Sequence, residues 1–173
     1  MTSYDHPPHE RSKMAARFGA DPIMAPHEVA LESFRYWTEL STFRKYKRPS
    51  ALGMMSMEDG ETSFRLGVVG DHGHAWGPFQ HQGGRRAEIL RQTGIDVATA
   101  PHLKALEGAD FEINKIPPYR KIAEQLEALT DPEEIVRLLV TKFEQAANPG
   151  DRDVHRRVNL YNFWDGELQK AGL

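Results

Sequence analysis

A glycine-rich window in the first half of the chain limits the possible folds more than any other feature. Residues 65–84 contain six glycines, namely Gly67, Gly70, Gly73, Gly77, Gly83 and Gly84. Glycine inside a helix is destabilising, so no long helix survives at this density. Short alternating pieces at 64–66 and 68–69 instead predict a small hairpin or loop region.

Helical periodicity dominates on both sides of this window. Ser50 is expected to be the N-cap of the second helix, Gly94 is expected just after the third, and Asp131-Pro132 is typical of a helix start. We therefore expect a mainly α architecture with helices at about 26–45, 51–60, 85–94, 99–109, 119–126, 132–147 and 154–168. Function often resides on a loop of this kind when a rigid scaffold holds it.

Composition excludes several classes of protein. The 173 residues include no cysteine, which excludes a disulfide scaffold, a thiolate nucleophile, a zinc finger and an iron–sulfur centre. The net charge is −3, with 22 basic and 25 acidic residues, which argues against a nucleic-acid partner. No apolar run approaches the roughly 18 residues needed for membrane insertion. Residues 1–25 are polar and broken by proline, which predicts an irregular arm and no signal peptide.

The expected helix at 51–60 ends in an acidic segment that points to acid catalysis. Glu61 lies one turn beyond Met57, at the end of an apolar stripe, where a partly desolvated carboxyl favours its neutral form. The like charge of Glu58 acts in the same direction. A protonated carboxyl is what cleavage of a glycosidic bond needs, because the leaving oxygen must receive a proton. The alternative is that these acidic residues are ordinary solvent-exposed side chains at the end of a helix.

The segment 70–80 offers groups that suit a sugar ligand. Gln80 carries both a donor and an acceptor for an N-acetyl group. Trp76 and Phe79 would present apolar platforms to sugar rings, with core packing as the alternative for both. Asp71 is the best second carboxylate, with turn formation as its alternative. Backbone at Gly77 can approach a ligand closely, since no Cβ intervenes.

These segments resemble the lysozyme-like superfamily. Residues 61–64 fit the Glu-Ser-Ser-Phe element of that superfamily, residues 70–80 fit its Gly-Asp-x-Gly element, and Arg85 begins its third. The resemblance is closest to lysozyme domains of phage tails, and more distant to goose-type lysozymes and soluble lytic transglycosylases. Thr62, Pro78 and His81 depart from the usual pattern.

The resemblance implies a lysozyme-like α+β domain over residues 26–173. It implies cleavage of the β-1,4 MurNAc–GlcNAc bond of peptidoglycan, as a muramidase or lytic transglycosylase, without metal or cofactor. Glu61 would be the general acid, with Glu58 as its rival, and Asp71 or Glu58 would assist. The glycan would be bound by Gln80, Trp76, Phe79, His81 and Gly77. The protein would act from a phage particle, in contact with tail proteins, or reach the periplasm or cell wall through another factor.

Two other classes of function remain open. His72 and His74 share one face if they lie on a strand, and with His81, Asp71 and Glu61 they would form a zinc site of a cell-wall amidase or peptidase. The second class is a non-catalytic lysozyme-like module that binds peptidoglycan or forms part of a phage particle. Inhibition by a chelator would mark the zinc enzyme, and binding without soluble products would mark the module.

Overall fold

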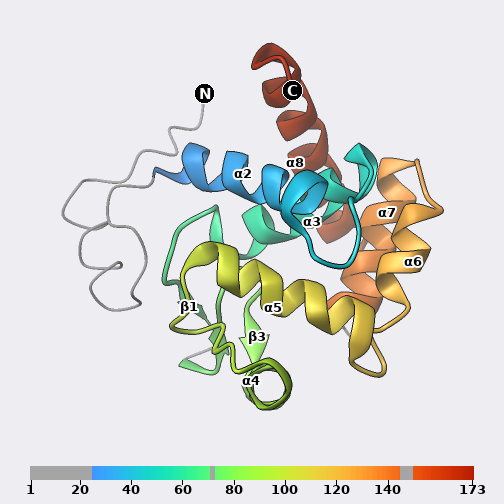
Figure 1. Ribbon diagram of the computed structural model, residues 1–173. Coiled ribbons are helices and arrows are strands. Elements are labelled where there is room, and N and C mark those ends of the chain that lie inside the picture. Colours follow the sequence, from blue (N-terminus) through green and yellow to red (C-terminus); the bar gives the residue numbers. More distant parts are fainter. Residues whose placement is uncertain (1–24, 71–72, 145–149) are drawn as a thin grey trace.

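The computed structural model describes residues 25–70, 73–144 and 150–173, and this part of the chain is mainly helical (Figure 1). The mainly α expectation is therefore confirmed, whereas the arm expected at 1–25 lies outside the described residues except for Ala25. The helical elements in chain order are α2 (Pro26–Arg35), the π-helical turn η1 (Tyr36–Leu40), α3 (Arg48–Thr62), α4 (Gly83–Thr93), α5 (His102–Lys115), α6 (Ile122–Glu127), α7 (Pro132–Leu138), the π-helical turn η3 (Leu139–Phe143) and α8 (Asp151–Lys170).

Helix α3 forms the centre of the structure and packs against α8, α7 and α2. Its side chains are buried without a break from Ser50 to Asp59. Unbranched Met54, Met55 and Met57 fill the irregular spaces between the neighbouring helices. Burial around the whole helix explains why it shows no clear polar face.

The start of α3 differs from the prediction. The helix begins at Arg48 rather than at residue 51, and Lys47 occupies the N-cap position. Pro49 is accommodated in the first turn, where a backbone N–H has no partner within the helix. Ser50 is therefore not the N-cap: its hydroxyl is buried inside the helix and donates to Glu127 Oε1 at 2.5 Å.

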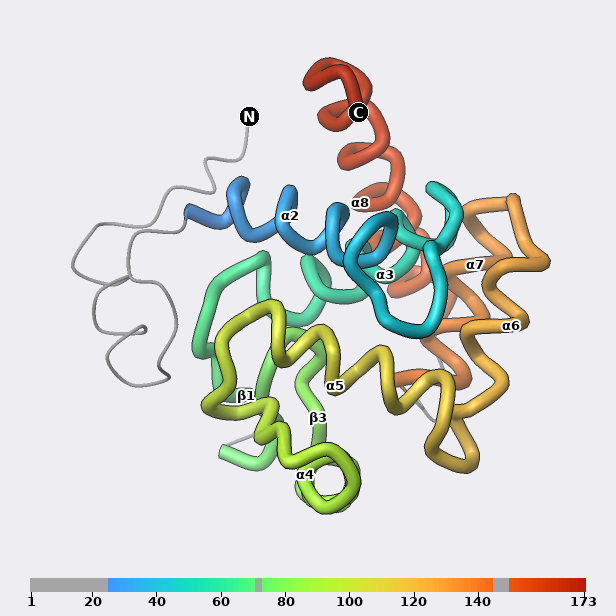
Figure 2. Tube along the Cα trace, in the orientation of Figure 1, coloured from blue at the N-terminus to red at the C-terminus, as the bar shows by residue number. Residues whose placement is uncertain are grey.

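The expected hairpin region is a three-stranded antiparallel sheet in the order β1-β2-β3. Its strands are β1 (Val69–Gly70), β2 (Ala75–Trp76) and β3 (His81–Gln82), with Val69 opposite Trp76 and Trp76 opposite His81. The tube in Figure 2 shows the chain leaving α3 for this sheet and continuing through α4 into α5, while α6 and α7 lie at the other end of the molecule.

The first predicted helix ends earlier than expected. It changes to a π-helical turn at Tyr36 and stops at Leu40 instead of continuing to residue 45. Ser41 is extended, and its hydroxyl donates to Asp110 on α5 at 2.5 Å. The hydroxyls of Tyr36 and Tyr46 donate to the same buried carboxylate, so a tertiary contact ends this helix.

Two further helix boundaries follow local signals. Gly94 ends α4 in the left-handed conformation, with φ of +76°. Asp131 caps α7 by accepting the Glu134 N–H at 3.0 Å, as its sequence signature predicts. The helix expected at 132–147 comprises α7 and η3 and stops at Phe143, and residues 145–149 lie outside the described part.

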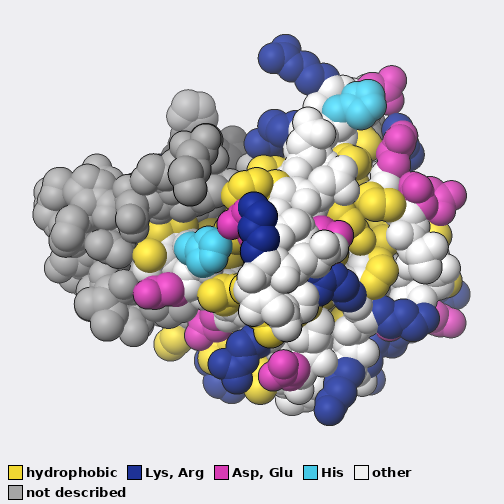
Figure 3. All heavy atoms as spheres, turned by 90° about the horizontal axis from the view of Figure 1, so that it is seen from above, with side chains coloured by type: hydrophobic (Ala, Val, Ile, Leu, Met, Phe, Trp, Pro, Cys, Tyr) yellow, Lys and Arg dark blue, Asp and Glu magenta, His cyan; other side chains and the backbone are white. Residues whose placement is uncertain are grey.

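The surface seen in Figure 3 mixes both signs of charge. Lys and Arg side chains alternate with Asp and Glu side chains on this face, in keeping with the small net charge. Within the described ranges, no helix is both long enough and apolar enough to cross a membrane.

Candidate active site

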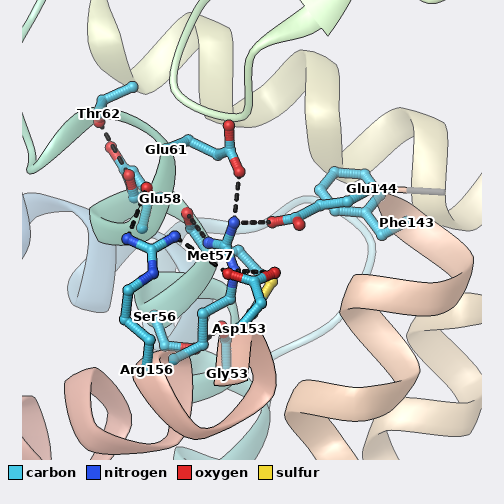
Figure 4. A network of polar contacts seen from close by, with 12 residues as sticks. Gly53, Ser56, Met57, Glu58, Glu61, Thr62, Phe143, Glu144, Asp153 and Arg156 are labelled. Carbon is cyan, nitrogen blue, oxygen red and sulfur yellow. Dashed lines mark hydrogen bonds and ion pairs between the residues drawn. The ribbon is translucent and has the colours of Figure 1, made fainter. Parts of the chain in front are cut away.

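Glu61 lies at the C-terminal end of α3 and is directed toward α8 (Figure 4). One of its carboxylate oxygens accepts a hydrogen bond from Arg157 Nη2 at 2.5 Å. The Glu61 side chain remains 24% exposed, whereas that of Arg157 is only 3% exposed. The acidic group at the end of this helix is therefore anchored on one side and open to solvent on the other.

Arg157 gathers three carboxylates around one buried guanidinium. Besides Glu61, its Nη2 lies 3.1 Å from Glu144 Oε1, and its Nε lies 3.7 Å from Asp153 Oδ2. The contact with Glu144 is an ion pair in which the N–H is not directed at the oxygen. The Nη1 donates to the Met57 carbonyl at 3.1 Å, which fixes the guanidinium against α3.

The ionisation of Glu144 is strongly perturbed by its surroundings. Burial raises the pKa of Glu144 to about 8, although Arg157 lowers it, and the nearby carboxylates of Glu61 and Asp153 raise it further. One guanidinium cannot neutralise three carboxylates. Glu144 therefore keeps a proton near neutral pH.

A glycine in α3 makes room for this arrangement. A Cβ at Gly60 would lie 1.9 Å from Arg157 Nη1, so no other residue fits there while the guanidinium stays in place. Glycine within a helix costs roughly 1 kcal/mol relative to alanine. The close approach of Arg157 explains why a glycine occupies the position next to Glu61.

Glu58 is one turn earlier on α3 but lies in a closed cluster. Its side chain is 1% exposed, and its oxygens contact the Ser33 hydroxyl at 2.7 Å and His102 Nε2 at 2.5 Å. The other ring nitrogen of His102 lies 2.6 Å from Glu32. Burial alone lowers the pKa of His102, but Glu58 and Glu32 outweigh it and hold the pKa at about 9. Glu58 thus has no free oxygen to offer a substrate in this arrangement.

The sheet region holds several of the expected glycan-binding residues. The Gln80 amide donates to the carbonyls of Val68 and Gly77 at 3.1 and 3.0 Å, which fastens the loops of the sheet together. Gly77 has φ of +77°, and a Cβ there would lie 2.7 Å from the Val97 carbonyl oxygen. Glu58 and Gly77 both line a small cavity of about 30 Å³ between the sheet and α5. Asp71, the expected second carboxylate, lies outside the described residues.

The aromatic candidates differ in exposure. Trp76 is half-buried, and the Arg86 guanidinium lies over its ring at 4.5 Å. Two hydrogen bonds of 2.7 Å to Asp96 fix Arg86 in this position. Phe79 is packed in the core against Trp37 and is only 3% exposed. Core packing is thus what the structure shows for Phe79, which has no surface for a sugar ring.

His81 is also enclosed by protein. Its ring is 0% exposed, and Nε2 lies 2.9 Å from Glu112 Oε2. Arg85 adds two hydrogen bonds of 2.8 Å to the same carboxylate. Burial opposes ionisation of Glu112, but His81 and Arg85 outweigh it and lower the pKa to about 2. His81 therefore links the sheet to α5 and is not available to a ligand in this arrangement.

Among the described residues, the histidines of the zinc hypothesis do not form one group. His74 is exposed on the loop, His81 is buried against Glu112, and His72 lies outside the described residues. In the described ranges, no three His, Asp or Glu side chains are grouped so as to bind a metal ion.

A larger cavity of about 460 Å³ lies elsewhere, between the ends of α4 and α5. Phe43, Ile95, Lys104 and Phe111 are among its lining residues. It includes none of the catalytic or glycan-binding residues that the sequence indicated, so it does not form part of the candidate site.

Sequence reasoning missed Arg157 and did not assign Glu144 a role in the site. Arg157 lies on the buried stripe of α8, with Val154, Tyr161, Trp164 and Leu168. A charged residue at such a position is a detectable signal, because a buried charge requires a partner. Comparison with protein-family models, curated protein sequences and solved structures finds no match to this chain.

Proposed function

We propose that this protein is a glycosidase that cleaves the β-1,4 MurNAc–GlcNAc bond of peptidoglycan, with Glu61 as the general acid. The observation that carries the proposal is the position of Glu61: a partly exposed carboxyl at the end of a buried helix, sharing one guanidinium with Glu144, whose pKa is raised by burial to about 8. Glycosidic cleavage uses carboxyls whose environments drive their protonation states apart.

The proposed reaction begins with proton transfer from Glu61 to the leaving glycosidic oxygen. The C1–O bond breaks, its electron pair stays with that oxygen, and positive charge develops at C1. Arg157 then stabilises the Glu61 carboxylate that remains, through the hydrogen bond it already makes. Capture of C1 by water would give hydrolysis, and capture by a hydroxyl of the substrate itself would give an anhydro product.

Asp71 remains the proposed second carboxylate. If it acts on water or on C1, its separation from Glu61 decides the stereochemistry: roughly 5 Å gives retention and 6.5–9.5 Å gives inversion. The exposed part of Trp76, with Arg86 over its ring, is the proposed contact for the glycan. Delivery in a phage particle, or by another factor, belongs to the same proposal.

The test is the release of soluble products from purified peptidoglycan, analysed by mass spectrometry, for the wild type and Glu61→Gln. We expect Glu61→Gln to lose about 10²–10⁴-fold in rate, as is usual for removal of a general acid. Glu134→Gln, the same change at an exposed site on α7, is the matched control and should leave the rate unchanged. A product end lighter by one water identifies transglycosylation, and a full-mass end identifies hydrolysis.

Two outcomes would overturn the proposal. Equal release by wild type and Glu61→Gln would remove Glu61 from the mechanism. Binding to peptidoglycan without release by any variant would instead identify a non-catalytic module.

A further inference from the structure

The second carboxyl on Arg157 is unexplained by a mechanism that uses Glu61 alone. Glu61 Oε1 and Glu144 Oε1 both contact the same nitrogen, Nη2, at 2.5 and 3.1 Å. Two carboxylates so close to one nitrogen repel each other when both are ionised. A proton on one of them relieves this repulsion.

Two requirements on Glu61 oppose each other in this environment. To protonate a leaving oxygen, Glu61 must carry a proton, but its carboxyl already accepts a charge-assisted hydrogen bond from the Arg157 guanidinium. The conflict disappears if a neighbouring group keeps the proton and Arg157 can change its partner. Only a carboxyl within reach of the same guanidinium satisfies both conditions.

We propose that Glu144 is a positioning residue that keeps this proton and transfers it to Glu61 when the glycan is bound. The inference rests on the proposed function of Glu61. In the transfer the O–H bond of Glu144 breaks and an O–H bond forms on Glu61. The Glu144 carboxylate that results is then paired with Arg157, and Glu61 passes the proton to the glycosidic oxygen.

The charged groups around Glu144 support this assignment. Glu61 approaches from α3, and Arg157 and Asp153 approach from α8. Arg156 draws off part of the Asp153 charge through a 3.2 Å contact. From α4, Arg85 pairs with Glu112 and donates to the Phe143 carbonyl, one residue before Glu144, at 2.7 Å. Arg157 is therefore the cation that governs both carboxyls.

The first experiment is a pH profile of peptidoglycan cleavage for the full chain and for Glu144→Gln. Glutamine preserves the shape of the side chain but cannot keep a proton that titrates. We expect kcat at pH 7 to fall by about 10-fold or more with KM almost unchanged, and the basic limb of the profile to move to lower pH. Glu144→Asp, which retains a titrating carboxyl, should recover part of kcat, and Glu134→Gln should match the wild type.

The second experiment does not depend on catalysis. In a ¹³C NMR titration of the full chain, the Glu144 carboxyl should titrate near pH 8. Its midpoint should move to lower pH in Glu61→Gln, since the Glu61 charge is one cause of the raised value. An active wild type whose pH profile is unchanged by Glu144→Gln would overturn this inference alone. An inactive wild type, with the NMR coupling intact, would overturn the proposed function instead.

Discussion

Glu58 and Glu61 lie one turn apart on α3, but their surroundings differ in kind. Glu58 is enclosed with His102, Glu32 and Ser33, and each of its oxygens has a partner. Glu61 is partly exposed and shares its cation with Glu144. In the first cluster a hydroxyl and a cationic ring satisfy the Glu58 carboxylate from both sides, and in the second three carboxyls surround one buried guanidinium.

In our proposal, one helix carries both a stabilising carboxyl, Glu58, and a reactive carboxyl, Glu61. A saturated cluster has no capacity to accept or release a proton without loss of stability. A cluster in which three carboxyls share one guanidinium keeps a proton that is available for transfer. The closed cluster around Glu58 and His102 should therefore control the free energy of unfolding. The open cluster, made of Glu61, Arg157, Glu144 and Asp153, should control activity.

The largest expected effect on stability is in the closed cluster. His102→Gln removes the charge that lies between Glu58 and Glu32, and breaking a buried ion pair in this way costs about 3–5 kcal/mol. Denaturant unfolding near pH 6 should show this loss. His74→Gln, on the exposed loop, is the control and should change the free energy of unfolding by less than about 0.5 kcal/mol. A loss below 1 kcal/mol in His102→Gln would mean that the closed cluster is not a stabilising unit.

The next effect is a loss of stability at alkaline pH. The pKa of folded His102 is about 9 against 6.5 when unfolded, so its stabilisation is full below pH 6.5 and is lost as pH rises through 9. The pKa of folded Glu144 is about 8 against 4.5 when unfolded, so its contribution is also lost as pH rises through 8. Thermal or denaturant unfolding between pH 6.5 and 9 should show a fall of roughly 3 kcal/mol from His102 and of roughly 2 kcal/mol from Glu144. A flat profile over this range would contradict both assignments.

The smallest expected effect is the change in the free energy of unfolding caused by Glu144→Gln at acid pH. Glu144→Gln should change stability by less than about 1 kcal/mol at pH 5, because it replaces one neutral side chain with another. At pH 9 the variant should be more stable than the wild type, since it no longer buries a third negative charge beside Arg157. Equal pH dependence in the variant and the wild type would show that Glu144 does not titrate between the two conditions.

Local sequence signals predicted the parts of the fold that depend on near neighbours. The glycine window became a small sheet, Gly94 ended a helix, and Asp131 capped one, because each acts through its own backbone conformation or within one turn. The position of Glu61 at the end of a buried helix was predicted in the same way. The lysozyme-like identity of the fold remains a proposal.

Long-range partners could not be read from local spacing. Arg157 meets Glu61 across 96 positions of sequence, and His102 meets Glu58 across 44. Ser41 is turned out of its expected helix by Asp110, which follows 69 residues later. The same limitation explains Phe79 and His81, since the apolar and polar groups that enclose them come from other helices.

Gly60 gives this arrangement a recognisable trace in sequence. The Arg157 guanidinium occupies the space that a Cβ at position 60 would need. The residue before Glu61 and the arginine on the last helix are therefore expected to change together. A chain of this type that replaces the glycine must also lose or move the arginine, and with it the cation that joins the two carboxyls. The dipeptide Gly-Glu at the end of a buried helix, with an arginine on the apolar stripe of the final helix, is therefore a search pattern for other proteins that share this site.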